Sequence, residues 1–465
     1  MEIKLRISLL IAKLRLYTFG LSFTRQRCSP AGIPPQNTSS SIFRSIFYGV
    51  HHGGACRRGI KPDTPHGNPR TGFPFPRRAG IGYNPHMDGF YEFFAGGGMA
   101  RLGLGPDWKC LFANDICEKK ASAYRANFDG APELIVKDIR SITPAMLPRG
   151  ATLAWGSFPC QDLSLAGNYN GLDGERSGVF WPFWKIIRTL DAKGRTVPLV
   201  VIENVEGLLT SKDGEDFKAL VSIVAKAGYR VGAMVLDASH FLPQSRPRLF
   251  VVAVKGLAIP ESAVRSDPHP LWHTKTMVAG VRALPEAARK AWVWFNPPYP
   301  REEVSRLSEL IEDRPTGVRW HTKEETNRII GMMSDVNLEK IRFAQHSTKR
   351  MIGAIYKRTR KFNGASIQRA EVRFDISGCL RTPVGGSSRQ IILVVDGKKI
   401  RSRLLSPREA ARLMGVPDGY KLPDRYNDAY HLMGDGLAVP VVRHLAEHIL
   451  TPILEGRGYR RAEEG

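Results

Sequence analysis

The sequence is short of acidic residues and cysteines and lacks a long apolar run. Its six cysteines include no C-x-x-C pair, so neither a zinc site nor a disulfide framework is indicated, and we expect a reducing, cytoplasmic setting without a metal. No stretch approaches the roughly 18 uninterrupted apolar residues that span a bilayer, so we expect no membrane partner. Acidic residues number 44 against 68 lysines and arginines, a net charge of +24. This excess favours a polyanionic partner such as nucleic acid.

The first 86 residues lack any sustained apolar period. A stretch rich in Pro, Gly, Ser and Arg runs from Arg25 to Pro85, and such a segment cannot bury enough apolar surface to offset the entropy of ordering. Residues 1–87 hold 13 Lys and Arg but only two acids. We therefore predict that residues 1–86 form a basic, disordered extension. It is either an arm that adds nonspecific nucleic-acid affinity or the product of an upstream start, with translation beginning at Met87.

After Met87, short apolar runs alternate with segments of helical period. The runs predict strands at residues 89–96, 109–115, 133–139, 151–158, 198–205, 230–238 and 246–254. The intervening helices are predicted at residues 99–105, 118–128, 178–190 and 215–228. Strands that are apolar on both faces and separated by helices indicate an α/β fold with a doubly wound, mostly parallel sheet. In that architecture ligands bind beyond the carboxyl ends of the strands.

The first three strand ends together fit a nucleoside-shaped ligand. Three consecutive glycines, Gly96–Gly98 in "FFAGGGMARLGL", allow a tight turn and close approach of a ligand to the backbone, although a plain strand-to-helix turn is an equal alternative. Asp115 follows the second strand and can accept hydrogen bonds from a ribose diol. Asp138 follows the third strand and can accept from an exocyclic amine. For each aspartate, a helix cap is the competing structural role.

The next two strand ends carry a cysteine and a glutamate. Cys160 stands between Pro159 and Gln161 in "GSFPCQ", and taken alone a cysteine is more often a buried structural thiol than a nucleophile. Glu203 in "VIENVEGLL" ends an apolar run, so we expect its carboxyl to be poorly solvated and its pKa to be raised. A carboxyl that stays protonated can serve as a general acid.

A cationic segment follows in "FLPQSRPRLF". Gln244, Arg246 and Arg248 occupy alternate positions, and residues two apart on an extended chain share a face. Both guanidinium groups can therefore point into one cleft. A cation near Cys160 would favour the thiolate, which is the nucleophilic form.

Seven segments of the chain form an ordered set. They are "FFAGGGMARLGL", "GSFPCQDLSLAG", "ERSGVFWPFWKIIR", "VIENVEGLL", "QSRPRLFVVAV", "SPREAARLMGVPDGY" and "GDGLAVPVVRHLAEHI". In this order they resemble the motif set of the DNA cytosine-5 methyltransferases, over a span from about Phe90 to about Ile449 with one variable block. The resemblance implies a Rossmann-like, S-adenosylmethionine-dependent catalytic domain with a second, smaller target-recognition domain, and double-stranded DNA as the substrate.

The resemblance also implies a mechanism. The Cys160 thiolate would add to C6 of a flipped cytosine, C5 would take the methyl group of S-adenosylmethionine, and loss of the C5 proton with elimination would free the sulfur. Glu203 would bind N3 and the exocyclic amine, and Arg248 would contact O2 with Arg246 supporting the pocket. The residues implied for the cofactor are Phe94, Ala95, Gly96, Gly97, Gly98, Asp115, Ile116, Asp138, Ile139 and Pro159. Those implied for the substrate are Gln161, Ser164, Asn204 and Gln244.

The same resemblance divides the chain into domains. Residues 87–256 are expected to be catalytic and cofactor-binding, 257–403 to form the variable target-recognition domain, and 404–465 to return to the catalytic domain. Within the last segment, Ser406 with Glu409 three residues on predicts a capped helix.

Three local features of the sequence bear on the comparison with the family. Leu437 stands where the last family motif has asparagine, and Asp435 is a candidate replacement for that amide. Ile116 stands where an aromatic residue often stacks on adenine, so aliphatic packing is expected there. Six Lys and Arg lie between Lys349 and Lys361 in the variable block, where phosphate contact and a merely solvated basic face are equal alternatives.

Two other functions compete with DNA methylation. A transfer-RNA cytosine-5 methyltransferase of the same fold would carry Cys-Phe-Thr in the variable region, and none occurs between Lys255 and Ser406. A DNA-binding regulator would not need Cys160, Glu203 and Arg248 together, because binding alone requires no nucleophile. We expect a monomer in the bacterial cytoplasm, associated with the nucleoid, either with a cognate restriction endonuclease or as an orphan enzyme.

Overall fold

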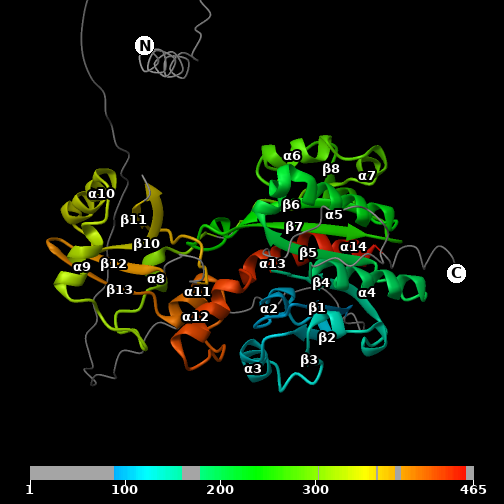
Figure 1. The fold of residues 1–465 in the computed structure, drawn as a ribbon, viewed down its shortest axis with the longest axis horizontal. Coiled ribbons are helices and arrows are strands. Elements are labelled where there is room, and N and C mark those ends of the chain that lie inside the picture. The colour runs from blue at the N-terminus through cyan, green and yellow to red at the C-terminus, as the bar shows by residue number, and fades with distance from the viewer. Residues whose placement is uncertain (1–87, 160–177, 302, 363–364, 383–388, 457–465) are drawn as a thin grey trace, which may run out of the picture. The chain divides into compact units, whose positions relative to one another are not determined.

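A computed structural model describes residues 88–159, 178–301, 303–362, 365–382 and 389–456. The largest sheet in these residues has seven strands (Figure 1). The strands are β1 (Asp88–Phe93), β2 (Trp108–Asp115), β3 (Leu134–Val136), β4 (Ala151–Gly156), β5 (Leu199–Val205), β6 (Arg230–Asp237) and β7 (Pro247–Val254). Their order across the sheet is β3-β2-β1-β4-β5-β7-β6. The pairs from β3 to β5 are all parallel, whereas β7 runs antiparallel to both β5 and β6. The predicted mostly parallel sheet is confirmed, with β7 as the exception.

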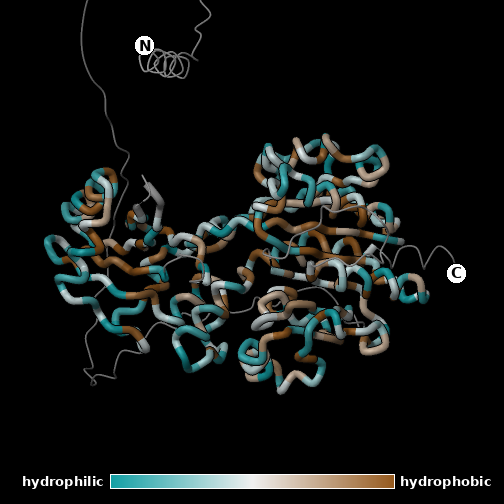
Figure 2. The backbone as a smooth tube through the Cα atoms, in the orientation of Figure 1, coloured by the Kyte–Doolittle hydropathy of each residue, from teal (hydrophilic) through white to brown (hydrophobic). Residues whose placement is uncertain are grey.

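Helices cover both faces of this sheet. Along β1, Phe90 packs into one hydrophobic cluster while Tyr91 and Phe93 pack into the other, because successive side chains point to opposite faces. The first cluster includes residues of α2 (Met99–Leu104), α3 (Glu118–Asn127), α13 (Val439–Leu445) and α14 (Thr451–Glu455). The second includes residues of α4 (Phe180–Ala192), α5 (Glu215–Lys226), α6 (Lys275–Arg282) and α7 (Glu286–Lys290). Figure 2 shows the hydrophobic residues gathered along the strands of the sheet. The doubly wound arrangement is therefore confirmed.

Several predicted strands end earlier than expected. The strand predicted at residues 133–139 stops at Val136, because the Asp138 carboxylate accepts a hydrogen bond from the Arg140 amide and begins a 3₁₀ turn over Ile139–Ser141. The strands predicted at 89–96 and 151–158 end at Phe93 and Gly156.

The segment after β7 remains with the large sheet. Met277 and Val281 of α6 pack in its second cluster, and β9 (Trp294–Phe295), paired with β8 (Val264–Arg265), lies beside β6 through a bridge between Val231 and Trp292. The elements between residues 264 and 295 thus pack with the large sheet, and a domain boundary at residue 257 stays a prediction.

A four-stranded antiparallel sheet forms the expected second, smaller unit. Its strands are β10 (Met351–Phe362), β11 (Ala365–Phe374), β12 (Ile391–Asp396) and β13 (Lys399–Leu404), in the order β11-β10-β12-β13. Residues of α9 (Lys323–Ile330) and α10 (Asp335–His346) pack on one face, around Ile355 and Leu393. On the other face, Ile352 and Val394 join the larger core together with α8 (Leu307–Leu310).

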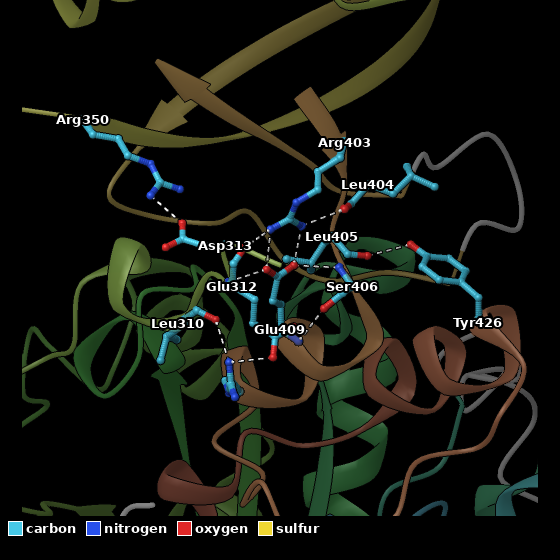
Figure 3. Close-up of polar contacts among 11 residues, drawn as sticks. Leu310, Glu312, Asp313, Arg350, Arg403, Leu404, Leu405, Ser406, Glu409 and Tyr426 are labelled. Carbon is cyan, nitrogen blue, oxygen red and sulfur yellow. Dashed lines mark hydrogen bonds and ion pairs between the residues drawn. The ribbon is translucent and has the colours of Figure 1, made fainter. Parts of the chain in front are cut away.

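A buried ion pair fastens the end of β13 to α11 (Pro407–Leu413) (Figure 3). Arg403 donates two hydrogen bonds of 2.7 Å to the Glu409 carboxylate, and both side chains are 0% exposed. Arg403 also donates to the Glu312 carbonyl oxygen at 2.8 Å, and Glu409 accepts from the amides of Glu312 and Ser406 at 2.8 Å each. Ser406 in turn caps the Glu409 amide, so the predicted capped helix is confirmed.

The C-terminal helices form an apolar run. Within the described residues, the helical run Tyr426–Glu455, which begins with α12 (Tyr426–Asp435), is the one candidate membrane span by length and composition. Its most apolar window is 67% buried inside the protein, where α13 packs against α2. Its apolar residues therefore serve the core.

Two histidines in this core make the fold sensitive to acid. His273 and His444 are 3% and 7% exposed, and burial lowers the pKa of each from 6.5 to about 4. The unfolded chain takes up protons at these rings below pH 6.5, whereas the folded chain does so only near pH 4. The stability contributed by the neutral rings is thus complete above pH 6.5 and is lost as the pH falls toward 4, by about 3 kcal/mol for each ring.

The variant His444→Gln tests this titration. Its amide can still donate to the Pro298 carbonyl oxygen, which His444 Nε2 meets at 2.9 Å, but it takes up no proton. We expect the urea midpoint of wild type to fall more steeply than that of the variant between pH 6.5 and 4. Equal slopes for the two proteins would contradict the prediction.

Candidate active site

A cavity of about 1070 Å³ lies beyond the carboxyl ends of β1, β2, β4 and β5. The strand order reverses between β1 and β4, and such a reversal opens a crevice in α/β sheets. The predicted residues that line this cavity are Phe94, Ala95, Gly96, Gly97, Asp115, Ile116, Asp138, Ile139, Pro159, Glu203, Asn204, Arg246 and Arg248. Cys160, Gln161 and Ser164 lie outside the described residues.

Two predicted site residues lie elsewhere. Gly98 precedes α2 with a φ of 78°, and a Cβ there would overlap the Phe128 ring, so this glycine serves close packing. Gln244 is 0% exposed, donates to the Leu413 carbonyl oxygen at 2.6 Å and accepts from the Leu380 amide at 3.1 Å. A contact from Gln244 to the substrate stays a prediction. β7 begins at Pro247, so Gln244 and Arg246 both precede the strand and Arg248 lies within it.

The glycine turn is held against the end of β2. The Gly96 amide donates to Asp115 Oδ2 and the Cys117 amide to Asp115 Oδ1, both at 2.8 Å. Gly96 has a φ of 57° and no atom lies within 4 Å of an added Cβ, so its backbone is open to a ligand. Phe94, which also lines the cavity, adopts a φ of 59°, which is costly for a residue other than glycine. The turn is thus a specifically built cradle.

The walls beside this turn suit a nucleoside. Ile116 is 67% exposed and lines the cavity, so a flat ring can pack on it. The Asp138 oxygens accept from the Arg140 amide at 2.8 Å and its guanidinium at 2.9 Å. The cap predicted as the alternative is therefore present, and a contact from Asp138 to an exocyclic amine stays a prediction.

The residues that the sequence analysis did not identify include Glu92 in the cavity wall and Tyr420, which holds the glycine turn. Glu92 lines the cavity at 1% exposure, where it accepts from the Arg101 amide at 3.3 Å and the Tyr124 hydroxyl at 2.9 Å, and burial raises its pKa to about 7. A glutamate inside the apolar run "GFYEFF" was the available signal. Tyr420 donates its hydroxyl to the Gly97 carbonyl oxygen at 2.7 Å, a contact across 323 residues that no local pattern indicates.

Glu203 and Arg248 meet at the ends of β5 and β7. Glu203 is 8% exposed, and its carboxylate lies 3.4 Å from Arg248 Nε. Burial raises the pKa of Glu203, and the opposing effects of Arg248, Arg246 and a hydrogen bond from Ser157 do not cancel it. The antiparallel pairing of β5 with β7 brings the two residues together, since it sets Val205 opposite Arg248. The site can therefore offer a protonated carboxyl beside a cation.

Arg246 joins three distant segments. At 2% exposure it donates to the carbonyl oxygens of Leu380, Gly434 and Gly436 at 2.9, 2.9 and 2.6 Å. It also donates to Cys379 Sγ at 3.3 Å. Burial opposes the Cys379 thiolate, but the charges of Arg246 and Arg248 outweigh it and lower the thiol pKa. Arg246 thus assembles the rim of the cavity.

Asn204 braces the end of β4. Its Nδ2 donates to the Phe158 carbonyl oxygen at 3.0 Å, and its Oδ1 accepts from the Val205 amide at 2.9 Å. Phe158 immediately precedes Pro159, so this amide fixes the backbone that leads toward Cys160. A direct contact from Asn204 to a substrate stays a prediction.

Comparison with known families adds an independent finding. The model of the family described as C-5 cytosine-specific DNA methylase matches residues 89–451. The chain belongs to this family. In this cytosine-5 DNA methylase, the residues that match the family model form the large sheet, the small sheet and the C-terminal helices.

Two bacterial relatives align with most of this methylase. Type II methyltransferase M.Bsp6I from Bacillus sp. (strain RFL6) is 25% identical over 368 residues, 78% of this chain and 98% of the relative. Type II methyltransferase M.MspI from Moraxella sp is 26% identical over 362 residues, 77% of this chain and 70% of the relative. The solved structure of Entamoeba histolytica methyltransferase EhMeth covers 79% of this chain and 98% of its own, with a TM-score of 0.50 and 16% identity. It supports the fold alone.

Proposed function

We propose that the chain transfers a methyl group from S-adenosylmethionine to C5 of a flipped cytosine in double-stranded DNA, at a specific short sequence. The observation that carries the proposal is the joint presence of the Glu203–Arg248 pair and the glycine turn in one cavity. Pro159, the residue bonded to Cys160, lines the same cavity. A nucleophile, a general acid and a nucleoside site are the parts that this chemistry needs.

The cavity residues fit the cofactor that the family uses. S-adenosylmethionine supplies an electrophilic methyl group when it is bound. The open backbone at Gly96 accommodates close approach of a ligand, and Asp115 retains lone pairs for a ribose diol beyond the amides that it accepts. Ile116 offers an exposed aliphatic surface for adenine, and Asp138 can accept from its amine.

Three residues of the chain have separate roles in the reaction of the cytosine base. The Cys160 thiolate adds to C6, and the electron pair of the C5–C6 bond moves toward C5 and the ring carbonyl. Glu203 donates its proton toward N3 while Arg248 stabilises the charge that develops on O2. After methylation, the C5 proton leaves to solvent and elimination releases the Cys160 thiolate. N3 then returns its proton to the Glu203 carboxylate, which restores the neutral ring. Flipping the base out of the duplex costs a few kcal/mol.

A basic hairpin supports DNA as the substrate. On β10, Arg358 lies over the Tyr356 ring at 4.8 Å, and Arg373 of β11 lies at 5.7 Å from the same ring. We propose that this face contacts phosphates, as expected for the cluster between Lys349 and Lys361. We also propose that the enzyme acts as a monomer, on nucleoid DNA in a bacterial cytoplasm. A cognate restriction endonuclease would fit the type II relatives.

Sequencing that detects methylated cytosine tests the function. DNA from cells that express the chain is expected to carry 5-methylcytosine in one short sequence context, and cells that express Cys160→Ala are expected to lack it. An unchanged mark in the Cys160→Ala cells would overturn the mechanism. A mark confined to transfer RNA would replace DNA as the substrate.

A further inference from the structure

We propose that Lys120 and Asp435 form the site that binds the amino-acid end of the cofactor, with Thr382 orienting the aspartate. This inference rests on the proposed function, because it concerns the ligand of the same cavity. It assigns a role to two residues that come from outside the glycine turn and the strand ends. Lys120 lies in α3, and Asp435 is the last residue of α12.

The pair is a joined but accessible ion pair. Lys120 Nζ lies 2.8 Å from Asp435 Oδ2, and both residues line the cavity. Their side chains are 27% and 40% exposed, so neither is sealed in the core. The Thr382 hydroxyl donates to the other carboxylate oxygen, Asp435 Oδ1, which fixes the plane of the carboxylate.

The pair lies beside the glycine turn. A Cβ at Gly97 would come within 3.0 Å of Leu432, and a Cβ at Gly436 would come within 2.8 Å of Met99, so the end of α12 packs directly on the turn. Along the sheet edge, Asp138 follows β3, Asp115 follows β2 and the turn follows β1. A cofactor with adenine at Asp138 and ribose at Asp115 therefore extends its amino-acid end toward the turn and α12.

The charges of the pair complement that end. The amino-acid group carries one ammonium and one carboxylate, and the pair presents one ammonium and one carboxylate side by side. Burial opposes the ionised form of Asp435, but the Lys120 charge and the bonds from Lys120 and Thr382 outweigh it and lower the Asp435 pKa. Asp115 and Cys117 also face Lys120, and His431 faces Asp435. Both members of the pair stay charged at neutral pH.

A neighbouring pair provides a matched control. Lys119, the residue before Lys120, pairs with Asp428 of α12 at 2.9 Å and joins the same two helices. Neither Lys119 nor Asp428 lines the cavity. If the ion pairs between α3 and α12 only hold the two helices together, removing either pair should have the same effect on ligand affinity. If the inner pair binds ligand, they should differ.

Calorimetry with two ligands separates these outcomes. S-adenosylhomocysteine has the amino-acid end, whereas 5′-methylthioadenosine lacks it. For Lys120→Met and Asp435→Asn we expect the affinity for S-adenosylhomocysteine to fall about tenfold or more, since hydrogen bonds to charged groups are lost. The affinity for 5′-methylthioadenosine should stay unchanged, and Lys119→Met should alter neither. Unchanged S-adenosylhomocysteine binding in Lys120→Met would overturn the inference.

A charge exchange removes the remaining structural explanation. Lys120→Glu combined with Asp435→Lys keeps an ion pair between the same helices but reverses its direction toward the ligand. We expect S-adenosylhomocysteine binding to remain weak in this double variant. Recovery to the wild-type affinity would show that the pair only holds the two helices together and would refute its role in binding. Wild-type protein that binds neither ligand would instead contradict the proposed function itself.

Discussion

Replacing Glu203 by glutamine is expected to lower the turnover number for DNA methylation by about 10²- to 10⁴-fold, the usual contribution of a general acid. The carboxyl is 8% exposed beside Arg248, and burial raises its pKa. Glutamine keeps the size and a hydrogen-bond donor but has no proton to release toward N3. The loss should therefore appear in turnover, while the affinity for S-adenosylhomocysteine stays within about twofold, because the cofactor residues are untouched.

The pH profile gives this prediction a second readout. Because the folded-state pKa of Glu203 is raised, its protonated form persists to higher pH than for an ordinary glutamate, and the wild-type rate should decline as the pH rises through that value. The Glu203→Gln rate should lack this decline. Glu215→Gln, at a 52% exposed side chain on α5 and outside the cavity, is the matched control and should behave as wild type. A turnover of Glu203→Gln close to that of Glu215→Gln would refute the assignment.

Replacing Arg403 by methionine is expected to destabilise the protein by about 3–5 kcal/mol, the typical cost of leaving one member of a buried ion pair without its partner. Both Arg403 and Glu409 are 0% exposed, so no water can solvate the carboxylate that remains. The Glu312 carbonyl oxygen would also lose its donor. Urea unfolding should show the loss as a lower midpoint with an unchanged slope.

The neighbouring pair in Figure 3 supplies the control for this variant. Arg350 pairs with Asp313 at 2.6 Å, but their side chains are 36% and 73% exposed. Arg350→Met should therefore change stability by no more than about 1 kcal/mol. Adding Glu409→Gln to Arg403→Met should recover part of the stability, because the uncompensated charge is removed. Equal effects of Arg350→Met and Arg403→Met would show that burial does not govern the contribution of these pairs.

The parts of the site that follow strands could be predicted from the sequence. Asp115, Glu203 and the glycine turn each end an apolar run, and parallel strands deliver their carboxyl ends to one edge of the sheet. Alternation predicted that Arg246 and Arg248 share one cleft, and both line the cavity, although only Arg248 lies within β7. Gln244, placed on the same face by alternation, lies before β7, where its side chain bonds to the backbone of Leu413 and Leu380.

The parts that depend on distant contacts could not be predicted. Tyr420 reaches Gly97 across 323 residues, and Asp435 reaches Lys120 from the other end of the domain. Hydrophobic period and turn chemistry describe only neighbours in sequence, so neither contact leaves a local signal. The antiparallel direction of β7 was missed for the same reason, since an apolar run predicts a strand but not its direction.

The packing of α2 against α13 bears on how the protein acquires its native state. Residues of α2, which follows β1, share one hydrophobic cluster with residues of α13. The two helices are so close that a Cβ at Gly103 would overlap Val442. A nascent chain therefore leaves the ribosome with the surface of α2 uncovered until α13 has been synthesised. Bringing α2 and α13 together closes a long loop of chain. The chain loses conformational entropy before the packing contacts form, so this step is slow. During that interval the exposed apolar surface invites aggregation or chaperone binding, and the methyl-transfer pocket remains unassembled.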